Sequence, residues 1–150
     1  MKKFAFLSLF IMFTVSAFSG EIVMLKDYHK LVGPKRIPHK KLSPSQTALK
    51  SGFAFVLCYW KSYSETLPEE KAAKWRLKNE NDAHANRMRE NALRHERRFE
   101  IISVKQQKQQ ATVVMTEDLG SLKLKYNVTL QKTAKGWIVT SFDTIEQTKK

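Results

Sequence analysis

The spacing of apolar residues changes near Phe99, and this change divides the chain into two kinds of secondary structure. Before Phe99, apolar residues recur every three or four positions, as they do on one face of an α-helix. After it, they recur at every second position, as they do on one face of a β-strand. Helices followed by consecutive strands predict an α+β fold, in which the helices pack on one antiparallel sheet.

The first helix is expected to begin at Ser43. Ser43-Pro44-Ser45-Gln46 supplies a capping serine, a proline in the first turn and the glutamine of a capping box. The expected core stripe then follows at helical spacing: Leu49, Phe53, Val56, Trp60, Tyr63 and Leu67. Phe55, Leu57 and Tyr59 lie off this stripe, so the middle of the helix needs apolar cover on more than one side. Gly52 and the many β-branched and aromatic residues leave a strand as the alternative.

Two more helix starts follow along the chain. Thr66-Leu67-Pro68-Glu69 repeats the start signal, with Thr66 as the cap, so a second helix is expected to follow closely. The segment 79–82 either interrupts this helix or starts a third one with Asn81 as its cap.

The second half of the chain predicts a four-stranded antiparallel meander. Strict alternation makes 122–130 the clearest strand, with one buried face and one wet face. Turns with a closing glycine precede and follow it at 117–120 and 133–136. The four expected strands are Glu100–Lys105, Ala111–Thr116, Leu122–Leu130 and Trp137–Phe142.

The start of the chain has the pattern of a secretory signal peptide. Lys2 and Lys3 precede an apolar run of 15 residues, Phe4 to Phe18, whereas a membrane-spanning helix needs about 20. Cleavage after Ser19 is favoured over cleavage after Ala17 or an uncleaved anchor, and it predicts a periplasmic or secreted protein without a permanent membrane anchor. The expected organisation is a signal peptide at 1–19, a basic extended lead-in at 20–42, one α+β domain at 43–146 and a basic tail at 147–150.

The formal net charge of +13 predicts an anionic partner or surface. The positive residues concentrate at 26–41 and 71–98, and the second segment predicts a basic binding stripe. Export and the lack of interleaved aromatic residues disfavour nucleic acid and favour anionic envelope polymers or lipid head groups. A basic surface that only maintains solubility remains the alternative. The stripe residues are Arg87, Arg94 and Arg98 at helical spacing, with Arg97 beside them.

Residues that carry catalytic or metal chemistry are sparse. Cys58 lies inside an apolar run and is expected to be a buried hydrophobe. His29 and His39 are expected at the surface, and His84 and His95 share a helical face without a third ligand. No metal or cofactor is therefore predicted. The nearest carboxylate pair, Asp143 and Glu146, is expected to be two exposed charges. The candidate pocket or core aromatics are Tyr59, Trp60, Tyr63 and Trp137.

The order of elements resembles the nuclear transport factor 2-like superfamily and its cystatin-like relatives. The resemblance covers about Ser43 to Ile145, and it is carried by the helical stripe Phe53, Val56, Trp60 and Tyr63 and by Lys135-Gly136-Trp137-Ile138-Val139. It implies a cone-like curved sheet around a pocket, a fold that serves enzymes, ligand binders and assembly domains, such as the periplasmic part of a type IV secretion component. The chain departs from catalytic members because it lacks an Asp/His pair at pocket-facing strand positions, and from the secretion component in its short leader.

Taken together, these features predict an exported, non-enzymatic binding or assembly module of the bacterial cell envelope. Two alternatives stay open. One is a small-molecule pocket enzyme of the same fold, and the other is a basic adaptor for an anionic envelope polymer or a membrane surface. The expected partners are envelope proteins or anionic envelope polymers.

Overall fold

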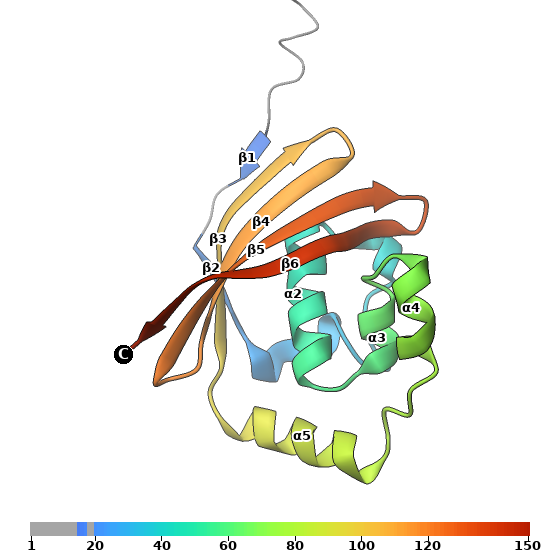
Figure 1. Ribbon diagram of the computed structural model, residues 1–150, viewed down its shortest axis with the longest axis vertical. Helices are drawn as coiled ribbons and strands as arrows, with labels where there is room; N and C mark the ends of the chain where they lie inside the picture. Colours follow the sequence, from blue (N-terminus) through green and yellow to red (C-terminus); the bar gives the residue numbers. More distant parts are fainter. Residues whose placement is uncertain (1–14, 18–19) are drawn as a thin grey trace, which may run out of the picture.

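A computed structural model describes residues 15–17, in backbone only, and residues 20–150 (Figure 1). The other residues of the expected signal peptide lie outside the described part, and so does the expected cleavage position at Ser19. Within the described residues, no helix combines the length and the apolar character that a membrane crossing requires.

The fold is α+β, as predicted, with the helices mostly before the sheet. The helical segments are η1 (Leu25–Lys30), η2 (His39–Lys41), α2 (Pro44–Val56), α3 (Trp60–Ser64), α4 (Glu69–Arg76) and α5 (Ala83–Arg94). The strands are β1 (Val15–Ala17), β2 (Glu21–Met24), β3 (Arg98–Gln107), β4 (Gln110–Asp118), β5 (Leu122–Thr133) and β6 (Gly136–Lys149).

The predicted antiparallel meander is present as β3, β4, β5 and β6, but four strands is too few for the whole sheet. Strands β2 and β1 also pair antiparallel with β3, one after the other along its outer edge. Strand β6 extends well beyond Phe142, because Leu122 at the start of β5 pairs with Lys149. Register shifts interrupt the β3–β4 pair and the β5–β6 pair, and such bulges bend strands. The sheet curves over helix α2 (Figure 1).

Helix α2 begins as predicted but ends much earlier. The backbone N–H of Gln46 donates to Ser43 Oγ, and the N–H of Ser43 donates to Gln46 Oε1, which completes the capping box. The expected continuous stripe to Leu67 is wrong, because the helix stops at Val56 and Cys58 adopts a φ of 59°. This bend turns the chain, so Leu57 is fully buried although it lies off the stripe. Buried apolar residues near the end of α2 are thus covered on several sides because the chain changes direction at Cys58.

The two later helix starts are each close to the predicted position. Helix α4 has Pro68 at its N-cap, and the hydroxyl of Thr66 donates to the Tyr63 carbonyl instead of capping. Helix α5 is capped by Asp82, whose carboxylate accepts from the N–H of Ala85 at 2.8 Å, so the expected cap at Asn81 is one residue early. Helix α5 lies apart from the other helices, below them in Figure 1.

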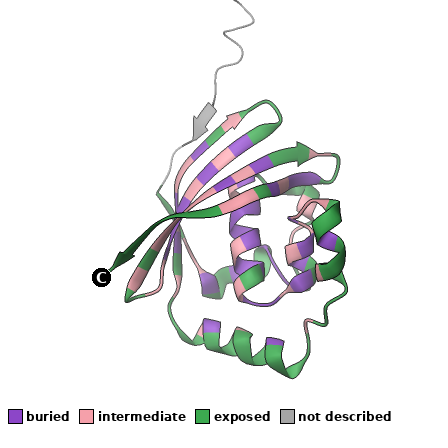
Figure 2. Cartoon of the chain, in the orientation of Figure 1, coloured by how far each residue is buried: buried purple, intermediate pink, exposed green. Residues whose placement is uncertain are grey.

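The core lies between α2 and the concave face of the sheet (Figure 2). The rings of Phe53 on α2 and Phe99 on β3 meet edge to face, with centroids 4.9 Å apart. Cys58 is a buried free thiol, as predicted, and burial raises its pKa. The segment at 20–42 contributes a strand, two short helices and several buried side chains, namely Leu25, Tyr28, Leu31, Val32 and Leu42.

A buried polar network joins this segment to α2 and to the sheet. The Lys50 side chain is fully buried, and its ammonium donates to Glu65 Oε1 at 2.6 Å and to His39 Nδ1 at 3.1 Å. His39 in turn donates from Nε2 to the Trp137 carbonyl at 2.7 Å. The expectation of a surface histidine at this position is therefore wrong. Arg36 donates from two guanidinium nitrogens to the same Glu65 carboxylate.

The network shifts the pKa values of its members in directions that follow from burial and charge. Burial and the Lys50 ammonium lower the pKa of His39, and burial also lowers the pKa of Lys50, although the neighbouring Glu65 opposes this. Burial would raise the pKa of Glu65, but hydrogen bonds from Arg36 and Lys50 outweigh it and bring the value to about 2. At neutral pH, Glu65 is an anion held between two cations.

Candidate functional site

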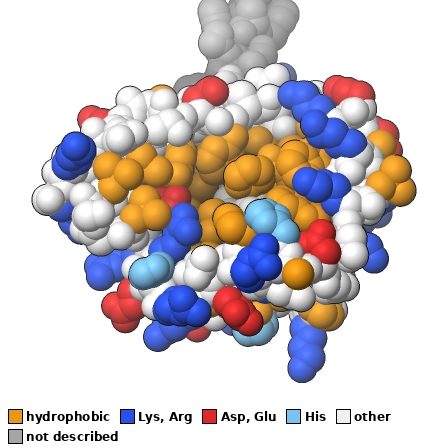
Figure 3. Space-filling view, turned by 60° about the horizontal axis from the view of Figure 1, so that its bottom comes forward, with side chains coloured by type: hydrophobic (Ala, Val, Ile, Leu, Met, Phe, Trp, Pro, Cys, Tyr) orange, Lys and Arg blue, Asp and Glu red, His pale blue; other side chains and the backbone are white. Residues whose placement is uncertain are grey.

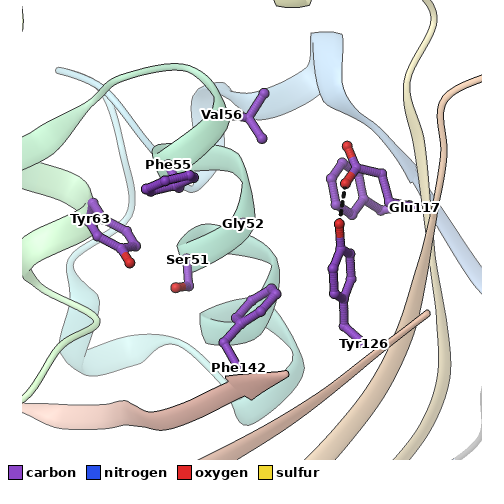
Figure 4. Close-up of a pocket in the computed structure, with 9 residues that line it drawn as sticks. Ser51, Gly52, Phe55, Val56, Tyr63, Glu117, Tyr126 and Phe142 are labelled. Carbon is purple, nitrogen blue, oxygen red and sulfur yellow. Dashed lines mark hydrogen bonds between the residues drawn. The ribbon is translucent and has the colours of Figure 1, made fainter. Parts of the chain in front are cut away.

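A hollow of about 280 Å³ lies between α2 and the concave face of the sheet (Figure 4). Side chains from α2, α3 and all four strands of the meander form its wall, because the curved sheet stands away from the helix at this point. The lining residues are Ser51, Gly52, Phe55, Val56, Tyr63, Phe99, Glu117, Tyr126 and Phe142.

The titratable groups of the hollow bind one another. Glu117 on β4 is buried, and its Oε1 accepts from the Tyr126 hydroxyl at 2.7 Å. Its Oε2 accepts from the Arg97 guanidinium at 2.9 Å. Burial and the hydrogen bond to Glu117 raise the pKa of Tyr126. The carboxylate is therefore held by a cation and a neutral phenol, and each of its two oxygens accepts from a protein donor.

Gly52 leaves the space of the hollow open. It lies inside α2 and has no positive φ, so its backbone does not require glycine. A Cβ here would lie 3.6 to 3.8 Å from the nearest atoms of Phe99, Met115 and Phe142, which is ordinary van der Waals contact. Glycine within a helix costs about 0.5–1 kcal/mol relative to alanine. The chain therefore gives up helix stability at a position where any side chain would enter the hollow.

An aromatic cluster forms the wall nearest to solvent, and it consists of Phe55, Trp60, Tyr63 and Trp75. The Phe55 side chain is 51% exposed, although its ring lies 5.3 Å from Tyr63 and 6.2 Å from both tryptophans. Trp75 lies 5.1 Å from Trp60 and from Tyr63. Phe55 therefore leaves apolar surface exposed to solvent beside the hollow.

The hollow continues into two larger depressions. One, of about 300 Å³, lies between α4 and β6, shares Ser51, Tyr63 and Phe142 with the hollow, and is bordered by Lys71 and Lys74. We call it the lysine mouth.

The second depression, of about 600 Å³, lies between α5 and the segment from Phe55 to Trp75. We call it the α5 groove. It shares Phe55 and Val56 with the hollow, and Met88 and Lys78 also line it. Figure 3 shows apolar side chains gathered around a hollowed region on this face, with Lys, Arg and His side chains and a few acids around them.

Three lysines border these openings without a carboxylate partner. In the described part of the chain, Lys71, Lys74 and Lys78 form no ion pair. The ammonium of Lys78 lies 4.9 Å from the Trp60 ring and 5.0 Å from the Trp75 ring, and that of Lys74 lies 5.3 Å from Trp75. The aromatic cluster is therefore rimmed by positive charge.

The predicted basic stripe is only partly one surface. Helix α5 ends at Arg94, so Arg98 begins β3 and does not share the helical face of Arg87 and Arg94. Both of these α5 residues are exposed. Arg97 has a side chain only 18% exposed and is paired with Glu117, so it belongs to the wall of the site.

The four predicted aromatics divide between the site and the core. Tyr63 lines the hollow, and Trp60 lines the α5 groove. Tyr59 lies under the Arg89 guanidinium at 4.0 Å, and Trp137 is buried in the core. Sequence reasoning missed Gly52, Phe55, Trp75, Glu117, Tyr126 and Phe142 as site residues. The available signals were Phe55 lying off the stripe and the glycine within the helix.

The remaining candidates lie elsewhere or lack partners. His84 and His95 both line the α5 groove, but the described residues contain no group of three His, Cys, Asp or Glu side chains that could hold a metal ion. His29 is exposed beside Tyr28. Asp143 and Glu146 are both exposed on β6, and neither lines the hollow.

Comparison with known protein families, with curated proteins and with solved structures found no match for this chain. The site must therefore be interpreted from its own geometry.

Proposed function

We propose that this protein is an exported, non-enzymatic binding module of the bacterial cell envelope, which holds the apolar part of a ligand in the hollow between α2 and the sheet. The observation that carries the proposal is Gly52. An interior helical glycine keeps an apolar space open where alanine would stabilise the helix and fit without a clash. A fold that needed only a closed core would gain by filling this space.

Binding in the hollow is driven by removal of apolar surface from water. Each Å² of apolar surface that the ligand and the wall bury contributes about 25 cal/mol. Phe55 provides such surface, because half of its side chain is exposed in the free protein. Phe142 and Tyr63 face the same space from the sheet and from α3 (Figure 4).

The polar groups of the hollow support binding more than catalysis. A general base needs a lone pair directed at the substrate. Glu117 instead accepts from Arg97 and Tyr126, and the pKa of Tyr126 is raised, which keeps its proton in place. These groups fix the wall of the site.

Location and ancestry are part of the same proposal. The apolar leader supports export, and the curved sheet over α2 is compatible with a cone-like member of the nuclear transport factor 2-like superfamily. Such folds house ligands between the helix and the sheet, which is where this chain has its hollow.

Two substitutions at one position test the proposal. Gly52→Ala adds a methyl group in ordinary contact and is expected to raise the free energy of unfolding by about 0.5–1 kcal/mol while weakening binding without abolishing it, because the methyl group occupies part of the hollow. Gly52→Leu extends into the hollow and is expected to abolish binding of a neutral apolar probe, N-phenyl-1-naphthylamine, measured by its fluorescence. Circular dichroism and urea unfolding verify that both variants fold. A folded Gly52→Leu variant that binds the probe as well as the wild type contradicts the proposal.

A further inference from the structure

The wall of the hollow selects against a peptide as the buried part of the ligand. Among the described residues, no buried side-chain nitrogen or oxygen lacks a hydrogen-bond partner, and Glu117 and Tyr126 bind each other. A peptide backbone would bring N–H and C=O groups into this wall, and each one left unpaired costs about 1–3 kcal/mol. An aliphatic chain brings none. The hollow therefore favours a hydrocarbon chain.

The lysine mouth supplies positive charge where such a chain would leave the hollow. Lys71 and Lys74 are three residues apart on α4, so they lie on the same side of that helix. Both are exposed, and neither is paired with a carboxylate, whereas the nearby Glu69 pairs with Arg76. Two adjacent, unpaired ammonium groups in a depression that opens from the apolar hollow match a ligand with an apolar chain and one anionic end.

The α5 groove supplies space for the other end of the chain. It begins at Phe55 and Val56, where the hollow ends, and continues past Trp60, Ala85 and Met88. These side chains are apolar, and Met88 is among the exposed large hydrophobic residues of the protein. A ligand longer than the hollow can thus extend along α5 in apolar contact.

From these three observations we propose that the ligand is a single-chain anionic amphiphile, a long-chain carboxylate such as a free fatty acid. Its carboxylate lies at Lys71 and Lys74, and its chain passes through the hollow beside Gly52 toward the α5 groove. This inference rests on the proposed function, because it names the ligand class of the same hollow.

The test compares ligands that differ in one property each. Sodium oleate, below its micelle concentration, and oleyl alcohol share one chain, but only oleate is charged. Calorimetric titration of the full chain at low ionic strength is expected to give at least tenfold tighter binding for oleate. Added salt is expected to reduce this preference, because the lysines are exposed and are screened over about 8 Å at physiological ionic strength. Anionic phospholipid vesicles and an acidic peptide complete the set, and weaker binding of both is expected.

Charge variants separate the head-group site from general attraction. Lys71→Ala/Lys74→Ala is expected to weaken oleate binding about threefold to thirtyfold, within the range of two exposed ion pairs, and to leave oleyl alcohol unaffected. The matched control Lys26→Ala/Lys30→Ala removes the same charge from exposed positions on η1 and is expected to change neither ligand. Gly52→Leu is expected to abolish both.

The outcomes distinguish the two levels of the proposal. Equal affinity for oleate and oleyl alcohol, or no effect of the lysine variant, overturns the anionic ligand class, while loss of both in Gly52→Leu still supports the hollow as a binding site. Tighter binding of vesicles or the acidic peptide, unaffected by Gly52→Leu, overturns the ligand class in favour of a surface interaction. Failure of oleate, oleyl alcohol and the neutral probe alike overturns the proposed function as well.

Discussion

The buried network around Lys50 predicts an unequal response to removal of either partner of one ion pair. The Lys50 side chain is 0% exposed, whereas that of Glu65 is 34% exposed and has Arg36 as a second partner. Glu65→Ala therefore leaves an ammonium group in a site that water does not reach. Lys50→Met removes the buried charge itself and leaves a carboxylate that keeps Arg36 and contact with solvent.

The structure sets the expected magnitudes. Removing one partner of a buried pair costs about 3–5 kcal/mol when the other charge stays uncompensated, and Glu65→Ala belongs to this class. In Lys50→Met the methionine replaces most of the apolar stem, and the main loss is the donor to His39 Nδ1. An acceptor left unpaired costs about 1–3 kcal/mol. The double variant Lys50→Met/Glu65→Ala has no buried charge left in this network, so it is expected to be more stable than Glu65→Ala alone.

Urea unfolding followed by tryptophan fluorescence measures all three variants, with linear extrapolation to water. Raising the pH from 7 toward 10 gives a second measurement on Glu65→Ala. Without Glu65, the pKa of Lys50 in the folded state lies further below its ordinary value of 10.5. The folded state then binds fewer protons than the unfolded state, so the stability of this variant is expected to rise with pH.

Additive effects would refute this reasoning. If the double variant is less stable than Glu65→Ala by the full cost of Lys50→Met, the ammonium is not desolvated in the folded protein. A Glu65→Ala variant with pH-independent stability between 7 and 10 would lead to the same conclusion.

Two further predictions concern pH and surface charge. The folded-state pKa of His39 lies below its ordinary value of 6.5, so stability is expected to fall as the pH drops below 6.5. The folded-state pKa of Glu65 is about 2 instead of 4.5, so stability is expected to fall again between pH 4.5 and 2. Urea unfolding of His39→Gln is expected to lose the first step only, and an unchanged profile contradicts the assignment. Arg87→Glu/Arg94→Glu is expected to reduce retention on a cation-exchange matrix without loss of stability. Arg97→Glu is expected to destabilise the fold, because the new carboxylate would face the buried Glu117. If all these variants are equally stable, the Arg97–Glu117 pair does not stabilise the fold.

The sequence predicted those helices and strands that are determined by interactions between neighbouring residues. The start of α2 was predictable because Ser43 and Gln46 satisfy the helix terminus by themselves. Strand β5 was predictable because alternation depends only on which face of the sheet is wet. The end of α2 was not, since the residues around Cys58 keep the same apolar spacing whether the helix continues or bends. Distant segments of the chain decide which of these side chains are buried, and the spacing of apolar residues does not contain this information.

The burial of Tyr28, Leu31, Val32 and Leu42 in the segment 20–42 was missed for a related reason. This segment lacks periodicity, and its prolines and lysines are typical of an exposed linker. Its buried residues, such as Leu25 and Val32, are held by partners far along the chain, and its His39 is fixed by Lys50 and the Trp137 carbonyl. Long-range hydrogen bonds and packing override composition here.

Gly52 shows how a conflict in the sequence can indicate a site. In the sequence alone it weakens the prediction of a helix and, with the β-branched and aromatic residues around it, leaves a strand as the alternative, because glycine disfavours helix interiors. The structure retains the helix, and it gives the glycine neither a positive φ nor a clash that would demand it. The remaining physical role of the missing side chain is the space that it leaves between Phe99, Met115 and Phe142. Departures from local secondary-structure preference are expected at functional sites. Gly52 departs from the helix preference, and adding a single side chain at this position tests the proposed function.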